Sequence, residues 1–440
     1  ILDNGDVKCW GNDQNGQLGD GGQLWTSSNQ TDTNTPSSTA IDLGTGRTAV
    51  AVSATQGHTC AILDNGDVKC WGNDAYGQLG DGGSNTDTNA PSSTAIDLGT
   101  GRTAVAVAAA EHHTCAILDN GDLKCWGRDY FGQLGDGGSN TNTNAPSSTP
   151  INLGTGRTAV AVSAGYHHTC AILDNGDLKC WGADTYGQLG NGGGVTHQTS
   201  PVAVSGYYTW DSSTGLSSGS SGGSSSSSSF AYANNKLGAG FHTCAILDNG
   251  DLKCWGWDVR GQLGDGGVSR VDLNSPPNTA IDLGTGRTAV AVSNGWRHTC
   301  AILDNGDLKC WGRDYHGQLG DGGSNTYITA PSTTAIDLGT GRTAVAVSGG
   351  YQHTCAILDN GDLKCWGNDD SGRLGDGGSN TDTTAPSTTA IDLGTGRTAV
   401  AVSSGAEHTC AILDNGDLKC WGGDQYGQLG DGGSNTVTTA

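Results

Sequence analysis

The chain has 440 residues, of which 75 are Gly, and it contains no Met and only three Phe. This composition lacks the long Leu- and Ala-rich amphipathic runs of helical proteins and predicts an almost purely β structure. The net charge of −23 at pH 7 disfavours nucleic acid and anionic membrane surfaces, because both bind through clusters of Lys and Arg. No apolar run is long enough to span a bilayer, so we expect no membrane insertion.

One phrase recurs eight times: ILDNGD, then Val or Leu, then KCWG. The copies begin at Ile1, Ile62, Ile117, Ile172, Ile246, Ile302, Ile357 and Ile412. A period of about 55 residues, with turn residues between short apolar runs, is typical of a propeller or a solenoid built from one repeated unit. We expect a single repeat domain over residues 1–440. The printed chain starts and stops within a repeat, so we also expect a fragment that is truncated at both ends.

From the second copy onward HTCA precedes the phrase, so cysteines recur in pairs ten residues apart. If Asp64-Asn65-Gly66 forms a three-residue loop with Gly in the left-handed region, Cys60 lies opposite Cys70. A two-residue Asn-Gly turn would instead put the two sulfur atoms on opposite faces of the hairpin. A structural zinc site is the alternative to a disulfide, but the close CxxC spacing of such sites is absent.

We therefore predict a disulfide in each repeat that carries both cysteines. The predicted pairs are Cys60–Cys70, Cys115–Cys125, Cys170–Cys180, Cys244–Cys254, Cys300–Cys310, Cys355–Cys365 and Cys410–Cys420. In the printed chain no HTCA precedes Cys9. A regular framework of paired cysteines is typical of oxidising compartments and predicts an extracellular or cell-surface location.

A second hairpin is predicted before the first. In TAIDLGTGRTAVAVS a two-residue Gly99-Thr100 turn joins TAIDL to the alternating strand RTAVAV and places Asp97 opposite Arg102. An exposed pair of this kind contributes less than about 1 kcal/mol. The two hairpins together predict four strands in each repeat.

Taken together, HTCAILDNGDLKCWGxDxxGQLGDGG resembles the regulator of chromosome condensation repeat family. The resemblance is carried by the Trp-Gly after the second Cys, by GQLG with its following Gly, and by the His before the first Cys. One such His occurs in each of seven repeats, at His58, His113, His168, His242, His298, His353 and His408. The resemblance implies an all-β fold, a β-propeller of about seven four-stranded blades; eight blades or an open repeat array are the alternatives. The paired cysteines are similar to those of the secreted branch of the family.

The near-identity of the repeats predicts that the protein is not an enzyme. An active site needs one asymmetric set of acid, base and nucleophile, whereas His, Cys and Asp recur identically here. We interpret the recurring His as a structural hydrogen-bonding group at a blade junction. DNGD and GDGG could bind calcium, but Asp, Asn and Gly are equally what tight turns demand. We therefore expect no cofactor, and loosely bound calcium is the open alternative.

Two windows differ between repeats: the residues before HTC and those after WG. Both flank strand ends, so in a propeller they gather on a face. Aromatic and Arg side chains in exposed loops are what protein and glycan interfaces favour. The candidate binding residues are Tyr76, Tyr130, Phe131, Tyr166, Tyr186, Trp257, Trp296, Tyr315, Tyr351 and Tyr426. Neutral drift in solvent loops is an alternative of equal weight.

The fourth repeat carries a Ser/Gly-rich insertion, residues 205–236. Its Ser/Gly run cannot bury apolar area, so we expect it to be flexible and solvated, and outside the cell it could carry O-glycans. Asn29 begins an Asn-Gln-Thr sequon and is a candidate glycosylation site.

These features predict an extracellular structural scaffold or fibre-forming repeat protein of a surface appendage, which would associate with copies of itself. The alternative is a secreted propeller that uses its aromatic loop face to bind a protein or a glycan. Nucleotide exchange on a small GTPase, as in the family's nuclear founder, fits poorly with disulfides.

Overall fold

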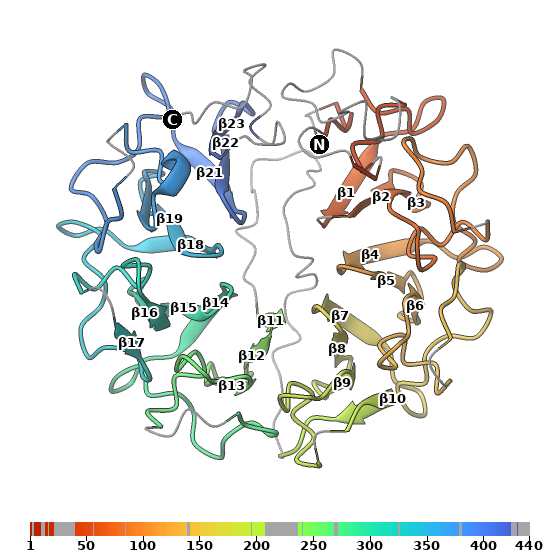
Figure 1. Ribbon diagram of the computed structural model, residues 1–440, viewed down its shortest axis with the longest axis horizontal. Coiled ribbons are helices and arrows are strands. Elements are labelled where there is room, and N and C mark those ends of the chain that lie inside the picture. The colour runs from red at the N-terminus through yellow and green to blue at the C-terminus, as the bar shows by residue number, and fades with distance from the viewer. Residues whose placement is uncertain are drawn as a thin grey trace. The chain divides into compact units, whose positions relative to one another are not determined.

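The computed structural model describes residues 1, 4–9, 14–15, 17–21, 40–55, 57–83, 85–138, 141–194, 196–206, 236–239, 241–267, 272–323, 326–377, 381–423 and 429. The chain divides into two compact units, which we describe separately: unit 1, Ile1–Thr185 with Leu189–Ser229, and unit 2, Tyr186–Gln188 with Phe230–Ala440. Within the described ranges the secondary structure is β throughout, apart from one short 3-10 helix, Asp370–Gly372 (Figure 1). The predicted all-β class is confirmed.

Unit 1 contains three described sheets, each a run of antiparallel strands. They consist of β1 (Ala49–Ala54), β2 (His58–Leu63) and β3 (Val68–Gly72); β4 (Ala104–Ala109), β5 (His113–Leu118) and β6 (Leu123–Gly127); and β7 (Ala159–Ala164), β8 (His168–Leu173), β9 (Leu178–Gly182) and β10 (Gln198–Ala203). Each sheet packs against the one before it, as β4 does against β1 and β2.

Unit 2 contains four described sheets of the same kind. They consist of β11 (Leu237–Ala239), β12 (His242–Ile246) and β13 (Leu252–Gly256); β14 (Ala289–Asn294), β15 (His298–Leu303), β16 (Leu308–Asp314) and β17 (Thr326–Ile328); β18 (Ala344–Gly349), β19 (His353–Leu358) and β20 (Leu363–Gly367); and β21 (Ala399–Ser404), β22 (His408–Leu413) and β23 (Leu418–Gly422). We call each sheet with its loops a blade.

The central hairpin of each blade has the register predicted from the cysteine spacing. Between β2 and β3, Cys60 lies opposite Cys70. The loop closes as expected, because Gly66 has φ +81 and its N–H donates to the carbonyl of Leu63 at 2.8 Å. Only Gly adopts this left-handed conformation without strain. The structure contains all seven predicted disulfides, from Cys60–Cys70 to Cys410–Cys420.

The fourth strand of the blade is not the one that the sequence suggested. TAIDL forms no strand; its Ile96 N–H makes a single bond to the carbonyl of Val68 at the start of β3. The fourth position is taken by the segment after GDGG, or after GNGG in one repeat, which forms β10 and β17 in two blades. In four others it touches the third strand through one bridge, such as Gly72 with Thr88. The second hairpin prediction was therefore wrong in its strand pairing.

The predicted cross-strand pair between Asp97 and Arg102 is also wrong. The Asp97 carboxylate accepts the N–H of Gly99 at 2.8 Å, which closes the turn locally. Arg102 instead lies 3.3 Å from Asp119 in the loop of the central hairpin. The same ion pair recurs as Arg47–Asp64, Arg157–Asp174, Arg287–Asp304, Arg342–Asp359 and Arg397–Asp414. The side chains of each pair are 35–36% exposed, and a pair of this kind contributes less than about 1 kcal/mol.

The hydrophobic core lies between successive blades. One cluster joins Cys60, Ile62 and Val68 of the first described sheet to Leu118 and Trp126 of the next, and all five are buried. Fully burying a Leu or Ile side chain contributes about 1.5–3 kcal/mol, so each blade is stabilised mainly by its neighbour. The GQLG turn takes part in this packing, because a Cβ on Gly135 would lie 2.5 Å from the indole Nε1 of Trp181.

Several predictions concern residues outside the described ranges. These are the Ser/Gly run within the 205–236 insertion, the candidate glycosylation site Asn29 and the candidate binding residue Tyr426. Within the described ranges no helix combines the length and the apolar character needed to cross a membrane.

Candidate functional site

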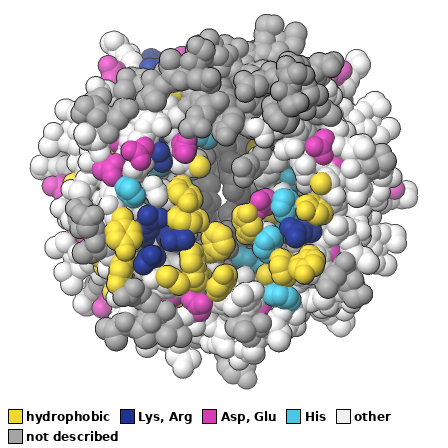
Figure 2. Space-filling model, viewed as in Figure 1, with side chains coloured by type: hydrophobic (Ala, Val, Ile, Leu, Met, Phe, Trp, Pro, Cys, Tyr) yellow, Lys and Arg dark blue, Asp and Glu magenta, His cyan; other side chains and the backbone are white. Residues whose placement is uncertain are grey.

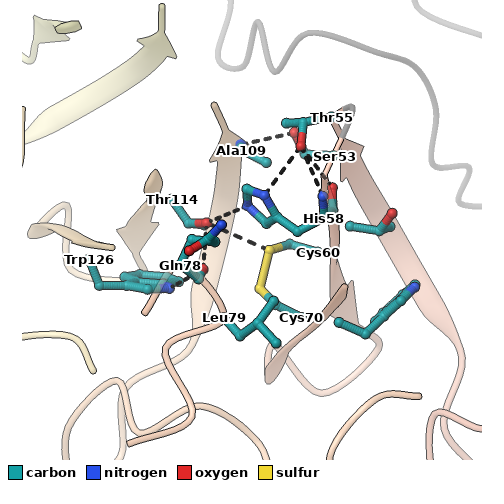
Figure 3. Close-up of a disulfide and its surroundings, with 12 residues drawn as sticks. Ser53, Thr55, His58, Cys60, Cys70, Gln78, Leu79, Ala109, Thr114 and Trp126 are labelled. Atoms are coloured by element: carbon teal, nitrogen blue, oxygen red, sulfur yellow. Dashed lines mark hydrogen bonds between the residues drawn. A yellow bond between two sulfur atoms is a disulfide. The ribbon is translucent and has the colours of Figure 1, made fainter. Parts of the chain in front are cut away.

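The recurring His links one blade to the next at five described junctions, all of them within a unit. His58 Nε2 lies 2.8 Å from the hydroxyl oxygen of Thr114 in the following blade (Figure 3). That hydroxyl donates its own hydrogen to the carbonyl of Gln78, at 2.9 Å, so the ring must be the donor in the His–Thr bond. The indole Nε1 of Trp126 donates to the same carbonyl at 3.0 Å. His, Thr, Gln and Trp of the repeat motif thus form one buried network at the blade junction.

The same His–Thr bond occurs at other junctions. It joins His113 to Thr169, His242 to Thr299, His298 to Thr354 and His353 to Thr409, at 2.7–2.9 Å. Burial lowers the pKa of His58 and His113 to about 3, with neighbouring histidines adding to the effect. A ring that stays neutral and donates to a fixed hydroxyl is a structural group, as the sequence analysis expected.

The junctions hold the two variable windows of each blade at one end of the sheets, where their side chains meet. In unit 1, Arg128 lies over the ring of Tyr76 at 4.8 Å and over that of Tyr130 at 5.6 Å. Phe131 contacts Tyr130 and the imidazole rings of His167 and His197, with centroids 4.7–4.9 Å apart. Tyr130 is 60% exposed and Tyr166 46% exposed. In Figure 2 this cluster is seen as hydrophobic side chains interleaved with histidines.

Burial and neighbouring groups shift the pKa values of ionisable residues in the unit 1 cluster. Burial and the nearby Arg128 charge lower the pKa of His167 to about 4. A hydrogen bond to Glu111 raises the pKa of Tyr166 to about 12. His112 Nε2 lies 3.6 Å from Glu111 Oε1. This cluster therefore contains its own carboxylate beside its cationic and imidazole groups.

The unit 2 cluster has a different composition. Trp296 and Tyr351 stack with centroids 4.1 Å apart and rings inclined by 18°. Their loops are tied together because the N–H of Trp296 donates to the carbonyl of Gly350 at 3.2 Å. The guanidinium of Arg297 lies 3.6 Å from the centroid of Trp296 and 4.9 Å from that of Trp257. Such cation–π contacts are worth about 0.5–2 kcal/mol and fix the guanidinium against the rings.

Further members extend the unit 2 cluster. Tyr186 and Phe241 contact Trp257 at 5.8 Å and 5.4 Å. The guanidinium groups of Arg260 and Arg313 lie 5.5 Å and 5.2 Å from the centroid of the Tyr315 ring. In Figure 2 the cluster is seen as hydrophobic side chains around Lys and Arg side chains. Every described candidate from the sequence analysis lies in one of the two clusters: Tyr76, Tyr130, Phe131 and Tyr166 in unit 1, and Tyr186, Trp257, Trp296, Tyr315 and Tyr351 in unit 2.

Sequence reasoning noted that Arg as well as aromatic side chains suit an interface, but it named only aromatic residues as candidates and so did not select the charged residues that complete the clusters. These are Arg128, Glu111, His112, His167 and His197 in unit 1, and Arg260, Arg297 and Arg313 in unit 2. Most of them stand in the same two variable windows, so a comparison of repeats by charge as well as by aromaticity would have found them.

The carboxylates considered for calcium are used by turns. Asp74 Oδ1 accepts the N–H of Leu79 at 2.9 Å, and Asp81 Oδ1 accepts that of Gly83 at 2.7 Å. Burial raises the pKa of Asp74 to about 6, with the Asp81 charge adding to the effect. Across the described ranges no three His, Cys, Asp or Glu side chains are grouped to hold a metal ion. Function without a cofactor, and loose calcium binding as its alternative, both stay predictions.

Repeated β-sheet blades, which pack on one another through their hydrophobic cores and carry variable loops at one end, define the protein as a β-propeller. Two models of the regulator of chromosome condensation (RCC1) repeat match the chain and place it in that family. The first matches residues 49–78, 104–133, 159–188, 238–262, 289–318, 344–373 and 399–428, and the second residues 4–62, 65–117, 120–172, 305–357 and 360–412. The protein belongs to the RCC1 repeat family.

Known relatives and structures support this assignment. The chain is 30% identical over 391 residues to the ultraviolet-B receptor UVR8 of Arabidopsis thaliana, which is 88% of this chain and 80% of that protein. Its fold is similar to that of human WBSCR16, with a TM-score of 0.65, 19% identity and coverage of 93% of this chain and 98% of that one. It is also similar to Prp20p of Saccharomyces cerevisiae, with a TM-score of 0.64, 19% identity and coverage of 92% and 90%.

These matches confirm the predicted fold class, an all-β propeller with seven repeat blades. Prp20p is a protein whose binding to Gsp1p and histones has been characterised. The expectation that this chain is not an enzyme stays a prediction.

Proposed function

We propose that the protein is an extracellular binding module that holds a protein partner on its aromatic loop clusters. The observation that carries the proposal is the convergence of the variable residues. In unit 2, Trp257, Trp296 and Tyr351 come from three different blades, yet each contacts Arg297 or a residue stacked on it. Rigid aromatic side chains and Arg dominate the binding energy of protein interfaces.

The rest of the blade supports this division of roles. The His–Thr–Gln–Trp junctions recur with one change, Arg373 in place of Gln, and together with the disulfides they fix the scaffold, whereas the cluster residues change from blade to blade. Function that varies on loops above a constant scaffold is the usual arrangement of binding proteins. Neutral, hydrogen-bonded histidines at the junctions provide no general acid or base, which supports a function in binding rather than in catalysis.

The extracellular location rests on the disulfides. Seven pairs bridge the central hairpins, and cytosolic thiols are kept reduced. The fibre-forming scaffold predicted first from the sequence, and a glycan as the partner, both stay predictions. We place protein binding ahead of them because the clusters give a specific surface on which a partner would be held.

Alanine substitutions of cluster residues test the proposal. A partner co-purified with the native protein should lose affinity for Trp296→Ala or Tyr130→Ala, by about 2 kcal/mol or more if the residue is a hot spot. Thr100→Ala, in an exposed turn of unit 1 that belongs to neither cluster, is the control and should bind like wild type. Unchanged affinity of both cluster variants would argue against these faces as the binding site.

A further inference from the structure

Three arginines gather on the aromatic rings of unit 2. Arg297 and Arg313 both lie over Trp296, at 3.6 Å and 5.5 Å from its centroid. Arg260 and Arg313 share Tyr315, at 5.5 Å and 5.2 Å. Burial and mutual repulsion lower the pKa of Arg297 and of Arg313. We call Arg260, Arg297 and Arg313 the arginine triad.

The arginine triad lacks the acidic partners that six other described arginines of this chain have. Among the described residues, Arg47, Arg102, Arg157, Arg287, Arg342 and Arg397 each pair with an Asp, and no carboxylate lies within 4.0 Å of any triad guanidinium. The Nε atoms of all three triad residues are buried and have no hydrogen-bond acceptor in the described structure. This concentration of positive charge stands in a chain of net charge −23.

Binding a carboxylate would stabilise a guanidinium that is partly buried and has no acidic partner. Its Nε is already out of water, so part of the desolvation cost of binding has been met in the free protein. The rings hold the three planar groups against Trp296 and Tyr315, and a planar guanidinium that is fixed in place can bind a carboxylate with two parallel hydrogen bonds.

We infer that the arginine triad is the site for an acidic segment of the partner protein, whose carboxylates it binds while an adjacent aromatic or apolar side chain packs on Trp296 and Tyr351. This inference rests on the proposed function and names the chemistry of its partner. A short acidic segment suits a local patch of positive charge, whereas a long polyanion would also meet the acidic remainder of the chain.

Defined peptides test the inference without an identified partner. A fluorescent peptide of alternating Glu and Tyr is titrated with the full protein by fluorescence anisotropy, beside a peptide in which Gln replaces every Glu. The Glu peptide should bind roughly tenfold or more tightly, since a hydrogen bond to a charged group is worth about 1.5–3 kcal/mol. Added salt should weaken the binding of the Glu peptide and leave the binding of the Gln peptide nearly unchanged. Equal affinity of the two peptides, or no binding of either at millimolar concentration, would overturn the inference.

Variants locate the site. Arg297→Ala should weaken the Glu peptide by roughly tenfold to a hundredfold, and Arg297→Lys should restore only part of the loss because Lys lacks the planar fork. Arg342→Ala, which removes an arginine already paired with Asp359 at 3.2 Å, is the matched control and should bind like wild type. The peptide comparison uses only wild-type protein, so it stands even if a variant folds poorly. Equal losses in Arg297→Ala and Arg342→Ala would contradict a local site.

Two further outcomes separate the inference from the proposed function. A heparin fragment that binds more tightly than the Glu peptide, and loses affinity in Arg297→Ala, would reassign the triad to a sulfated glycan and overturn the protein partner. A partner that depends on Trp296 and Tyr130 but not on the triad or on salt would leave the proposed function standing and refute the inference.

Discussion

The ring Nε2 of His58 lies 2.8 Å from the hydroxyl oxygen of Thr114, and the hydroxyl passes its hydrogen to the carbonyl of Gln78. Both side chains are fully buried. At the five described junctions of this kind, a blade therefore depends on its successor to satisfy its His, and the Thr depends on the preceding blade to position its acceptor. Stability in this chain is consequently a property of junctions rather than of single blades.

Removing one junction His should destabilise the fold. His113→Ala removes the bond to Thr169 and leaves a cavity beside a buried hydroxyl, so the free energy of unfolding should fall by about 1–3 kcal/mol. Guanidinium denaturation followed by Trp fluorescence measures the change. His316→Ala, which removes a partly exposed His that pairs with Asp382, should cost less than about 1 kcal/mol. A similar fall in the free energy of unfolding of both variants would mean that the junction bond stabilises the fold no more than an exposed pair does.

The junction histidines should make the protein sensitive to acid. Burial lowers the pKa of His58, His113 and His242 to about 3 and that of His168 and His298 to about 4. The unfolded chain binds protons at these rings below about pH 6.5, and the folded protein does so only near pH 3–4. Their contribution to stability is therefore complete above pH 6.5 and is lost as the pH falls. Denaturation midpoints across this range should show the loss.

Buried aspartates oppose this dependence. Burial raises the pKa of Asp314 to about 7, above its ordinary value of 3.8, with the Asp321 charge adding to the effect. The folded state then holds a proton that the unfolded chain has released, so this contribution is lost as the pH rises from about 4 to about 7. Asp314→Asn should remove the loss, and its stability relative to wild type should rise over that interval. A constant difference between the two proteins at every pH would contradict the assignment.

The GQLG glycine should tolerate no side chain where it faces the next Trp. Gly135 has φ +72, and a Cβ there would lie 2.5 Å from Trp181 Nε1. Gly156 has nearly the same φ of +69 but no atom within 4 Å of its Cβ position. Gly156→Ala should therefore cost only the backbone strain, about 1–2 kcal/mol, and Gly135→Ala should cost clearly more. Thermal unfolding of the two variants isolates the contact; equal midpoints would exclude it.

The disulfides should each stabilise their hairpin modestly. Replacing Cys170 and Cys180 together with Ala should lower the free energy of unfolding by about 2–3 kcal/mol, because the closed loop is short. Non-reducing peptide mapping of the wild-type protein should recover all seven intra-repeat pairs. Free thiols across most repeats would refute both the pairing and the proposed extracellular location.

Local spacing predicted the parts of the fold that local chemistry decides. The ten-residue separation of Cys60 and Cys70 was enough to select a three-residue loop and the register of β2 and β3. The same reasoning failed for Asp97, because its carboxylate could either pair across a hairpin or accept the N–H of Gly99, and spacing does not distinguish the two. A comparison of the repeats by charge would have marked the three arginines of the triad as candidates. That they gather on shared rings could not be predicted, since it depends on loops of successive blades meeting through contacts such as that between Trp296 and Gly350.

Site-specific crosslinking tests the central claim, that the loop clusters hold a protein partner. A photoreactive phenylalanine analogue is placed at Tyr351 or Tyr130, both exposed cluster residues, and at Thr100 as the control. Each variant is then irradiated in the protein's native extracellular environment. We expect protein adducts from Tyr351 and Tyr130 that are absent from Thr100, and mass spectrometry of the adducts identifies the partner. Adducts of equal yield from Thr100, or none from either cluster, would contradict the claim.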